Sequence, residues 1–210
     1  SLHGALPIFA FYLFALRYEP VARRHIPGNA NVALRVEFSR VLLFGPVRDH
    51  LWPLVTGAAA EAPAPGPSRV ARIRDATGID LATCPRELVV AWPDGASWVA
   101  ALGGRFRRGR FVRGLEKVLR EEGVRGYRRE GGLLVGPGGL AVGQADDGTL
   151  LLGSSAAIVT AALPASDDGE RLGLPDDGAV TFAITREAWS GASGVLGSIL
   201  DHTPALGRVE

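Results

Sequence analysis

The sequence has little cysteine and little histidine, and these shortages exclude several kinds of site. Cys84 is the single cysteine among 210 residues, so the chain holds no internal disulfide framework and no cysteine-based zinc site. The four histidines include no pair at i,i+4 and no cluster with acidic residues at the spacing of metal ligands. We therefore expect no metal site and no cofactor.

Sequence motifs of nucleotide-binding proteins and hydrolases are also missing. Residues 135–139 and 103–109 are rich in glycine, but the first segment lacks the Lys-Ser/Thr of a phosphate-binding loop and the second lacks the spacing of a dinucleotide fingerprint. Ser154, Ser155 and Ser193 lack the Gly-x-Ser-x-Gly spacing of a nucleophile elbow. We interpret the glycines as turns and Ser154 or Ser155 as a helix cap, and we predict no catalytic residue.

One long hydrophobic run is present, at the start of the chain. It covers residues 5–16 without a charge and includes Ile8, Phe9, Phe11, Tyr12, Leu13 and Phe14. A membrane-spanning helix needs about 20 apolar residues, so we expect residues 1–20 to be the outer part of a transmembrane or signal-anchor helix, with Tyr12 and Tyr18 near the interface. A buried helix of a soluble domain, or a partner-binding helix, is the alternative. Because Arg17, Arg23 and Arg24 follow the run and positive residues prefer the cytoplasm, the orientation stays open.

Arginine, alanine and glycine are abundant, whereas Lys117 is the single lysine, a bias that we attribute to a GC-rich bacterial genome. The formal net charge of +1 gives no overall reason to expect nucleic acid or an acidic partner. The charge is nevertheless uneven along the chain. Residues 105–129 carry ten basic against three acidic side chains, or +7, so the remainder sums to −6.

This basic run is the strongest functional signal in the sequence. A solvated helix face is the simplest interpretation, and the alternatives are contact with an acidic protein, with anionic lipid head groups or with another polyanion. Few aromatic residues lie among the arginines, so we expect no nucleic acid partner. We predict a partner-binding role for the first five arginines of the run: Arg105, Arg107, Arg108, Arg110 and Arg113.

Residues 68–163 contain helical and strand patterns in an order that indicates the fold class. We expect helices at 69–77, between a Ser68 cap and a terminating Gly78, and at 111–119 and 156–163. Strands are expected at 87–92, 97–102, 126–129, 133–135, 140–144 and 149–152, the first two joined by Pro93-Asp94-Gly95-Ala96 as a hairpin. Strands in adjacent runs favour an α+β fold with a mostly antiparallel sheet backed by helices.

The two ends of the chain carry similar units. Residues 31–38 alternate as a strand, and we expect Ser39 to cap a helix that is interrupted near Gly45-Pro46. The apolar face of this helix is expected to contain Val41, Leu42, Phe44, Val47 and Leu51. Residues 174–184 align without gaps on residues 26–36, and both units end in an Asp-His pair, at 49–50 and at 201–202. This indicates an internal duplication, in which the two Asp-His pairs are able to converge.

The predicted domain organisation follows from these patterns. An α+β domain covers residues 26–165, and a second turn-strand-helix unit at 174–210 either completes its sheet or starts a repeat. Residues 56–67, rich in alanine, proline and glycine, are expected to form a flexible loop.

The order of the elements also resembles a group of known proteins. Gly78-Ile79-Asp80-Leu81 at a helix end, and Asp-Asp-Gly-Thr-Leu-Leu-Leu-Gly-Ser from Asp146 to Ser154 before an alanine-rich helix, resemble uncharacterised, membrane-anchored, extracytoplasmic α/β proteins of GC-rich bacteria. The resemblance covers residues 26 to about 185. It implies an anchored domain outside the cytoplasm and no assigned reaction.

From these observations we predict a non-catalytic accessory or structural subunit of a bacterial membrane-associated assembly. We expect it to face the periplasm, to touch membrane lipid through its first residues and to contact other protein subunits. The alternatives are an extracytoplasmic ligand-binding or enzymatic domain whose site leaves no motif, and a polyanion-binding module.

Overall fold

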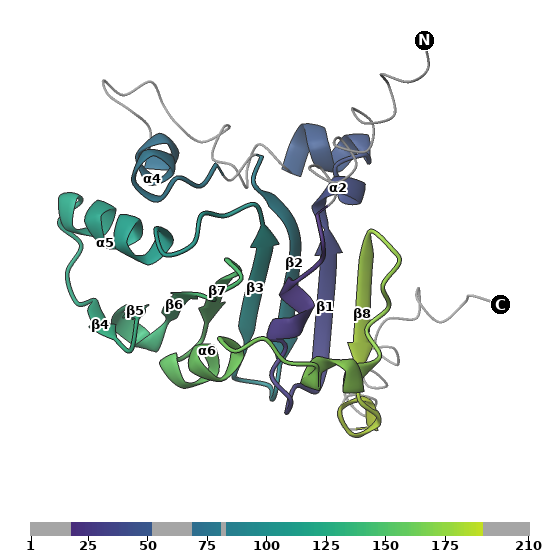
Figure 1. Ribbon diagram of the computed structural model, residues 1–210. Helices are drawn as coiled ribbons and strands as arrows, with labels where there is room; N and C mark the ends of the chain where they lie inside the picture. Colours follow the sequence, from purple (N-terminus) through teal and green to yellow (C-terminus); the bar gives the residue numbers. More distant parts are fainter. Residues whose placement is uncertain (1–17, 52–68, 81–82, 191–210) are drawn as a thin grey trace, which may run out of the picture.

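The computed structural model describes residues 18–51, 69–80 and 83–190, and Figure 1 draws the other residues as a grey trace. The strands are β1 (Val32–Glu37), β2 (Pro85–Trp92), β3 (Val99–Gly104), β4 (Arg128–Glu130), β5 (Leu133–Val135), β6 (Ala141–Gln144), β7 (Leu150–Gly153) and β8 (Val180–Ile184). The α-helices are α2 (Phe38–Val41), α4 (Arg69–Thr77), α5 (Phe111–Glu121) and α6 (Ala156–Ala162). The 3-10 helices are η2 (Ala22–His25), η4 (Pro137–Gly139) and η5 (Asp168–Leu172), and η3 (Val47–Leu51) is a π-helix.

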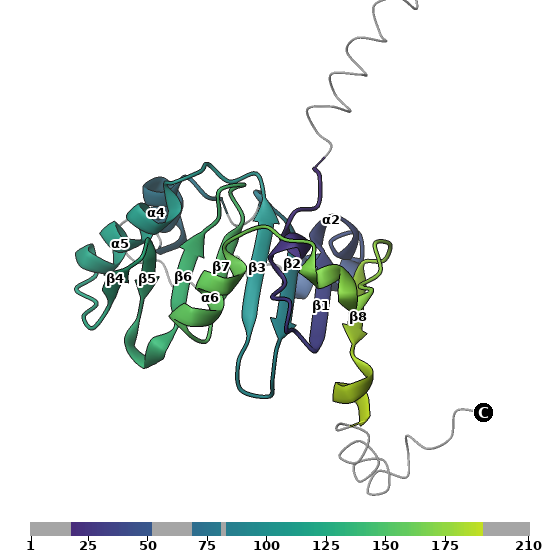
Figure 2. The same ribbon diagram turned by 60° about the horizontal axis from the view of Figure 1, so that its bottom comes forward.

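All eight described strands form one antiparallel sheet in the order β4-β5-β6-β7-β3-β2-β1-β8. Figures 1 and 2 show β4 and β8 at opposite ends of this sheet. The prediction of an α+β fold with an antiparallel sheet and packed helices is confirmed. None of the helices in the described residues is long and apolar enough to span a membrane.

Local sequence explains why the β2–β3 hairpin forms where it was predicted. Ala91 lies opposite Val99 in the register of the two strands. The Asp94 carboxylate accepts hydrogen bonds from the backbone N–H groups of Ala96, at 2.8 Å, and Ser97, at 2.6 Å. The side chain thus satisfies two donors in the connection, as aspartate does in many turns.

One face of the sheet carries the main hydrophobic core. Strand residues that alternate inward, such as Val89, Ala101 and Leu151, pack on this face. Their partners are Ala22 in η2, Ile26 directly after η2, and Val159 and Ala162 in α6. Leu172 and Leu174, at the end of η5 and beyond it, complete this core. Because successive strand residues point to opposite faces, η2, α6 and η5 cover a single face.

The other face is covered over part of its width. Leu150 and Leu102, which neighbour the inward-facing Leu151 and Ala101, form a second cluster with Ile79 after α4, Phe106 in the loop after β3 and Phe111 at the start of α5. Helix α5 contacts β5 and β6 and packs against α4. The sheet therefore has helices on both faces around β5, β6 and β7.

Several expectations for individual residues were wrong. Ser39 does not cap a helix: α2 already begins at Phe38, Glu37 is its N-cap, and the Ser39 hydroxyl donates to the Glu37 carboxylate at 2.8 Å. The helical segment is interrupted at residues 42–44, beside Gly45-Pro46 as expected, but Phe44 is 62% exposed and lies outside the predicted apolar face. The strand predicted at 126–129 begins only at Arg128, because Gly126 adopts a φ of 85°.

The unit at the end of the chain joins the sheet beside the unit at its start. Strand β8 pairs with β1, and residues 186–190 after it are helical, as are residues 38–41 after β1. In the register, Leu34 lies opposite Phe182, and Val32 and Val36 lie opposite Ile184 and Val180. Leu34 thus lies opposite the residue that the sequence alignment matches to it, Phe182. The alignment matches Val32 with Val180 and Val36 with Ile184, so the pairing of the two strands is symmetric about Leu34 and Phe182.

Candidate functional site

The predicted partner-binding arginines lie on the loop between β3 and α5 and on the first turn of the helix. Phe106 in this loop is 9% exposed, because its ring packs with Ile79 and Leu150 in the second hydrophobic cluster. Anchoring Phe106 directs its neighbours outward: Arg105, Arg107 and Arg108 are exposed. We call the five exposed arginines of this segment, Arg105, Arg107, Arg108, Arg110 and Arg113, the basic surface.

A single amide side chain holds the loop in place. The Gln144 side-chain nitrogen donates to the backbone carbonyls of Arg107 and Gly148, each at 3.1 Å, and its oxygen accepts from the backbone N–H of Phe111 at 3.4 Å. The Arg113 guanidinium donates to the Gly109 carbonyl at 3.1 and 2.9 Å. The backbone that carries the basic surface is therefore fixed to β6, to the turn before β7 and to α5.

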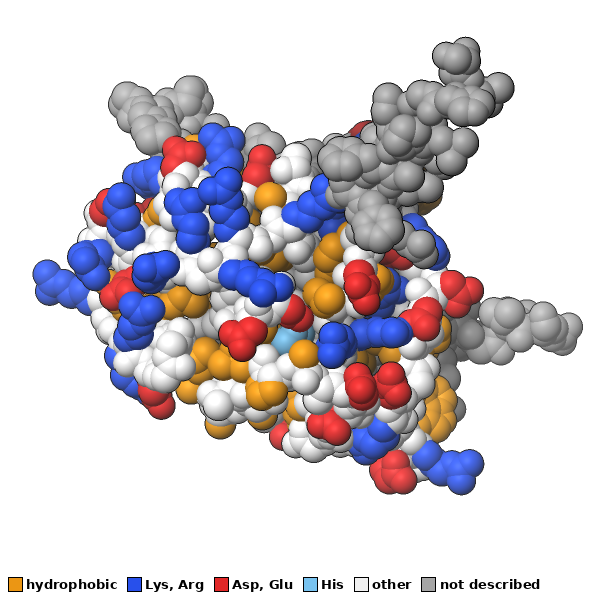
Figure 3. All heavy atoms as spheres, viewed as in Figure 1, with side chains coloured by type: hydrophobic (Ala, Val, Ile, Leu, Met, Phe, Trp, Pro, Cys, Tyr) orange, Lys and Arg blue, Asp and Glu red, His pale blue; other side chains and the backbone are white. Residues whose placement is uncertain are grey.

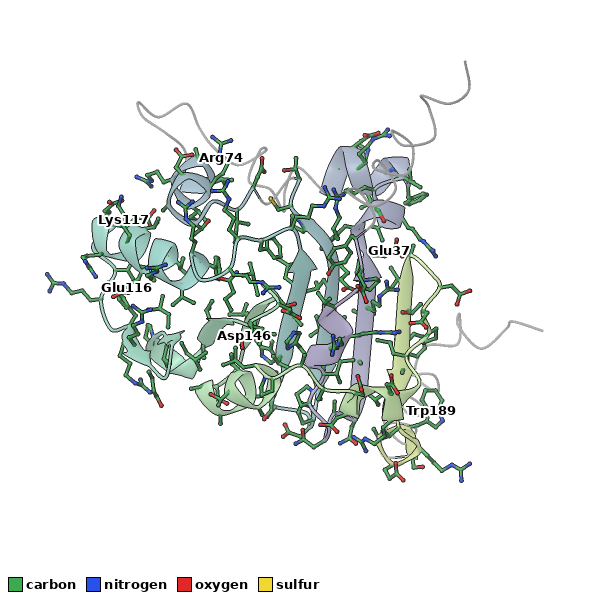
Figure 4. The ribbon with its side chains drawn as sticks, viewed as in Figure 1. Glu37, Arg74, Glu116, Lys117, Asp146 and Trp189 are labelled. Carbon is green, nitrogen blue, oxygen red and sulfur yellow. The ribbon has the colours of Figure 1, made fainter. Side chains whose placement is uncertain are left out.

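Helix α5 continues the basic stretch because its faces differ in sequence. Val112, Gly114 and Val118 are buried, while Arg113 and Lys117 between them are exposed. Gly114 permits the close approach of α4: a Cβ atom at this position would lie 2.4 Å from the Ala76 carbonyl oxygen. Figure 3 shows lysine and arginine side chains gathered over α4 and α5, and Figure 4 places Arg74 of α4 and Lys117 of α5 on the same side of the molecule.

The two halves of the basic run differ in how their charge is neutralised. In the second half Glu116 pairs with Arg120 at 3.2 Å and Arg129 at 3.4 Å, Glu121 lies 3.8 Å from Lys117, and Glu130 pairs with Arg128 at 3.1 Å. In the first half, Arg107, Arg108, Arg110 and Arg113 have no carboxylate of the described residues within ion-pair distance. Four of the five arginines of the basic surface thus lack a carboxylate neighbour among the described residues.

A buried ion pair lies under β1 and β2, and the sequence analysis did not find it. Glu87 is 1% exposed and accepts hydrogen bonds from Tyr18 Oη at 2.9 Å, from the Ala22 backbone N–H at 2.8 Å and from Arg35 Nε at 3.2 Å. Arg35, 4% exposed, also donates to the Asp176 carbonyl at 3.0 Å. Burial, the charge of Glu87 and the hydrogen bond to it raise the pKa of the Tyr18 phenol well above its usual value.

These contacts correct the expectation for Tyr18 and define the structural role of Glu87. Tyr18 was expected near a membrane interface, whereas its hydroxyl is held inside the domain by Glu87. Since each oxygen of the Glu87 carboxylate already accepts from the protein, Glu87 serves to join η2 to β1 and β2.

A second buried polar pair involves His25 of η2, which is 2% exposed. Its Nδ1 lies 2.7 Å from the Ala162 carbonyl oxygen and its Nε2 lies 2.9 Å from the Asp147 carboxylate. Both ring nitrogens thus lie within hydrogen-bond distance of an oxygen atom of the protein. With both nitrogens engaged, His25 offers none to a substrate.

Asp147 is held by donors from two directions. Besides His25, the backbone N–H of Thr149 donates to its carboxylate at 2.8 Å. Burial by itself raises the pKa of Asp147, but the hydrogen bonds from His25 and Thr149 outweigh burial and lower this pKa below its ordinary value. The pair thus ties η2 and α6 to the turn before β7.

Cavities on the described part of the surface include two of several hundred cubic ångströms. One, of about 420 Å³, lies between η2 and η5 and is lined by side chains of both signs, including Arg23, Arg24, Glu170 and Asp176. The other, of about 520 Å³, is lined mainly by apolar atoms of Val32, Trp92, Pro93 and Ala188. Within the described residues no group of three or more His, Cys, Asp or Glu side chains is placed to hold a metal ion.

The structure brings together few of the other residues that the sequence singled out. Ser155 caps α6 by accepting from the Ile158 N–H, and residues 137–139 form a turn, as predicted. Asp49 pairs with Arg48 at 2.8 Å beside an exposed His50. Several predicted positions lie outside the described residues: Ser193, Asp201, His202, the loop 56–67 and the membrane segment with Ile8, Phe9, Phe11, Tyr12, Leu13 and Phe14.

Comparison with other proteins leaves this geometry to be interpreted on its own terms. No protein-family model matches the chain, and no significant match is found among curated proteins or solved structures.

Proposed function

We propose that the chain is a non-catalytic accessory or structural subunit that docks onto an acidic surface of a partner protein through the basic surface. The observation that carries this proposal is a group of four exposed arginines, on the loop fixed by Gln144 and on the first turn of α5, that have no described carboxylate partner. Arginines held together repel one another, and an acidic partner relieves that repulsion. Guanidinium groups also form paired hydrogen bonds with carboxylates, which gives such a contact specificity.

The aromatic residues near the basic surface support a protein partner over a single-stranded nucleic acid. Binding of single strands commonly uses exposed aromatic rings on which bases stack. Phe106 is in the hydrophobic cluster, and Phe111 and Tyr127 are half-buried. The arginines therefore stand without a stacking platform beside them.

The finer features of the predicted architecture belong to the same proposal. We propose that the apolar run at residues 5–16 anchors the domain to a membrane, facing the periplasm, as the resemblance to anchored extracytoplasmic proteins implies. We also propose that the β1 and β8 units are copies of one ancestral unit. The matching start of the two strands, the helical residues after each and the symmetric register support the duplication.

Extraction of the native membrane in mild detergent, followed by pull-down through this chain and mass spectrometry, tests the proposed docking. The informative comparison is between Arg107→Glu/Arg108→Glu and a control, Arg48→Glu/Arg186→Glu, which makes the same change of charge at exposed sites elsewhere. We expect stoichiometric partners with wild type and control, about tenfold weaker recovery with the first variant, and recovery that falls with salt.

Two results contradict the proposal. The first is a partner that both variants recover equally, because the interface would then lie elsewhere. The second is a monodisperse monomer in detergent with no partner from native membranes.

A further inference from the structure

The free edge of β8 is the feature of the molecule that the proposed docking does not use. Strand β8 is the last strand of the described sheet, and β1 is its one strand neighbour there. Val180 and Phe182 are 56% and 67% exposed, and both are apolar. Exposed, apolar edge strands pair readily with another strand, so this edge needs an account of what covers it.

The pairing of β1 with β8 has a local two-fold symmetry. Residues 174–184 match residues 26–36 at a constant offset, and Leu34 lies opposite its own match, Phe182. A half-turn about an axis through this pair exchanges Val32 with Val180 and Val36 with Ile184. The same half-turn carries β2, the other neighbour of β1, onto the free edge of β8.

The backbone of β8 presents its unused groups at this edge. The Thr185 N–H donates to the Asn31 carbonyl, and the Glu37 N–H donates to the Ala179 carbonyl, each at 2.8 Å. Residues 179 and 185 thus point their backbone groups toward β1, and in a strand this orientation alternates. The N–H and C=O groups of Val180, Phe182 and Ile184 therefore point away from β1, toward the free edge.

We infer that the free edge of β8 is a docking site for an antiparallel strand of the β2 type, supplied by a β-hairpin of a partner protein. The inference rests on the duplication proposed above and not on the basic surface. By the symmetry, Val180, Phe182 and Ile184 take the partners that Val32, Leu34 and Val36 have in β2, which are Trp92, Val90 and Leu88. The occupant is thus an extended segment with large apolar residues on the face that carries Phe182.

The other face of the occupant differs from β2 in one respect. In β2, Glu87 is held inside by Arg35, Tyr18 and the Ala22 backbone. The residue that matches Arg35 in the second unit is Ala183, which has no charge. A buried carboxylate needs a partner, so the strand that docks on β8 carries an apolar residue where β2 carries Glu87.

The test uses the full chain and a synthetic probe, a fluorescein-labelled peptide of residues 85–104 with Glu87→Val. We expect binding by fluorescence anisotropy, and at least tenfold weaker binding of the same peptide with Glu87 retained. On the protein, Phe182→Pro removes the outward N–H while leaving the bonds to β1, whereas Phe182→Thr removes the same ring and keeps the N–H. We expect the Pro variant to bind the probe at least tenfold more weakly than the Thr variant.

Hydrogen exchange on the wild-type chain gives a result that does not depend on the Pro variant folding. Adding the probe should slow exchange at the amides of Phe182 and Ile184, and leave Thr181 and Ala183, which face β1, unchanged. No binding, equal binding by the two Phe182 variants, or protection elsewhere overturns the inference. So does a homodimer in sedimentation that Phe182→Pro disrupts and Phe182→Thr does not, because the occupant would then be a second β8. None of these outcomes bears on the membrane pull-down, which reports on the basic surface.

Discussion

The two edges of the sheet are built from opposite kinds of residue. At one edge, β4 has three exposed and charged residues, with an ion pair between Arg128 and Glu130, and the neighbouring strands have helices on both faces. At the other edge, β8 has five residues, Val-Thr-Phe-Ala-Ile, and Phe182 stands exposed on it. Charged residues on an edge strand discourage another strand from pairing. Among the described strands, the charges of β4 therefore discourage further pairing at one edge, whereas β8 carries no charged residue at the other.

The largest effect that we expect comes from the ion pair under β1 and β2, near β8. Glu87→Gln removes the buried charge 3.2 Å from Arg35 and leaves the guanidinium with the partly exposed and more distant Glu37 carboxylate, at 3.7 Å. Breaking a buried pair in this way costs about 3–5 kcal/mol of unfolding free energy. Chemical denaturation measures the loss. The same change on β4, Glu130→Gln, is exposed and should cost less than about 0.5 kcal/mol, and a loss as small at Glu87 would contradict the role assigned to the pair.

The next effect concerns the second helix layer near β4. Gly114→Ala places a Cβ atom 2.4 Å from the Ala76 carbonyl oxygen, so α5 must move away from α4. Alanine favours a helix by up to about 1 kcal/mol over glycine, but overpacking costs about 1–3 kcal/mol, and we expect net destabilisation. Thermal unfolding tests this, with Lys117→Ala on the exposed face of α5 as a near-neutral control. An equal or higher melting temperature for Gly114→Ala would show that the helices are not in close contact.

A smaller and pH-dependent effect on the free energy of unfolding is expected at Asp147, in the turn before β7 near the middle of the sheet. Its pKa is lower in the folded chain than in the unfolded chain, so the carboxylate stabilises the fold above about pH 4, and this stability is lost as the pH falls through the folded pKa. Asp147→Asn should cost about 1–2 kcal/mol at pH 7, and this difference should shrink at pH 3. Denaturation across pH 2–7 measures it. Asp146→Asn, at an exposed neighbour, should show no such trend, and an identical trend at both positions would exclude the assigned cause.

The smallest effect on stability is expected when the apolar and charged residues of the two edge strands are exchanged. These variants test the comparison of the edges directly. Arg128→Val/Glu130→Val makes β4 apolar, and Phe182→Lys places a charge on β8. Both variants should unfold within about 0.5 kcal/mol of wild type, since the changed side chains are exposed. Light scattering at rising protein concentration should show more self-association for the first variant and none gained for the second. If the apolar β4 stays as soluble as wild type, charge is not what discourages pairing at that edge.

Most of the fold could be predicted because its signals are local. The alternation in residues 87–92 and 97–102, the Asp94 turn and the glycine ends of α4 and α5 each lie within a few residues. The expected Ser39 cap failed because strand β1 runs on to Glu37 and the helix starts directly after it. There, sheet pairing decided the boundary and the capping signal had no influence.

The buried polar groups could not be predicted, because their partners are far apart in the chain. Glu87 meets Tyr18 across 69 positions, and His25 meets Asp147 across 122. A hint was present: Arg35 and Glu87 occupy positions of β1 and β2 that the alternation turns toward the core. Side chains with opposite charges on the inner face of neighbouring strands are a reason to expect a buried pair.

The Gln144 amide has a consequence for the affinity of the basic surface. Ordering a flexible loop during binding costs about 1–2 kcal/mol of conformational entropy for each residue fixed. Here three backbone groups, in Arg107, Phe111 and Gly148, are held by one side chain before a partner arrives. In the proposed complex, most of the ordering of this loop backbone has therefore been done by folding. We therefore expect the dissociation rate of the proposed complex to depend on Gln144, because this side chain orders the loop that carries the arginines.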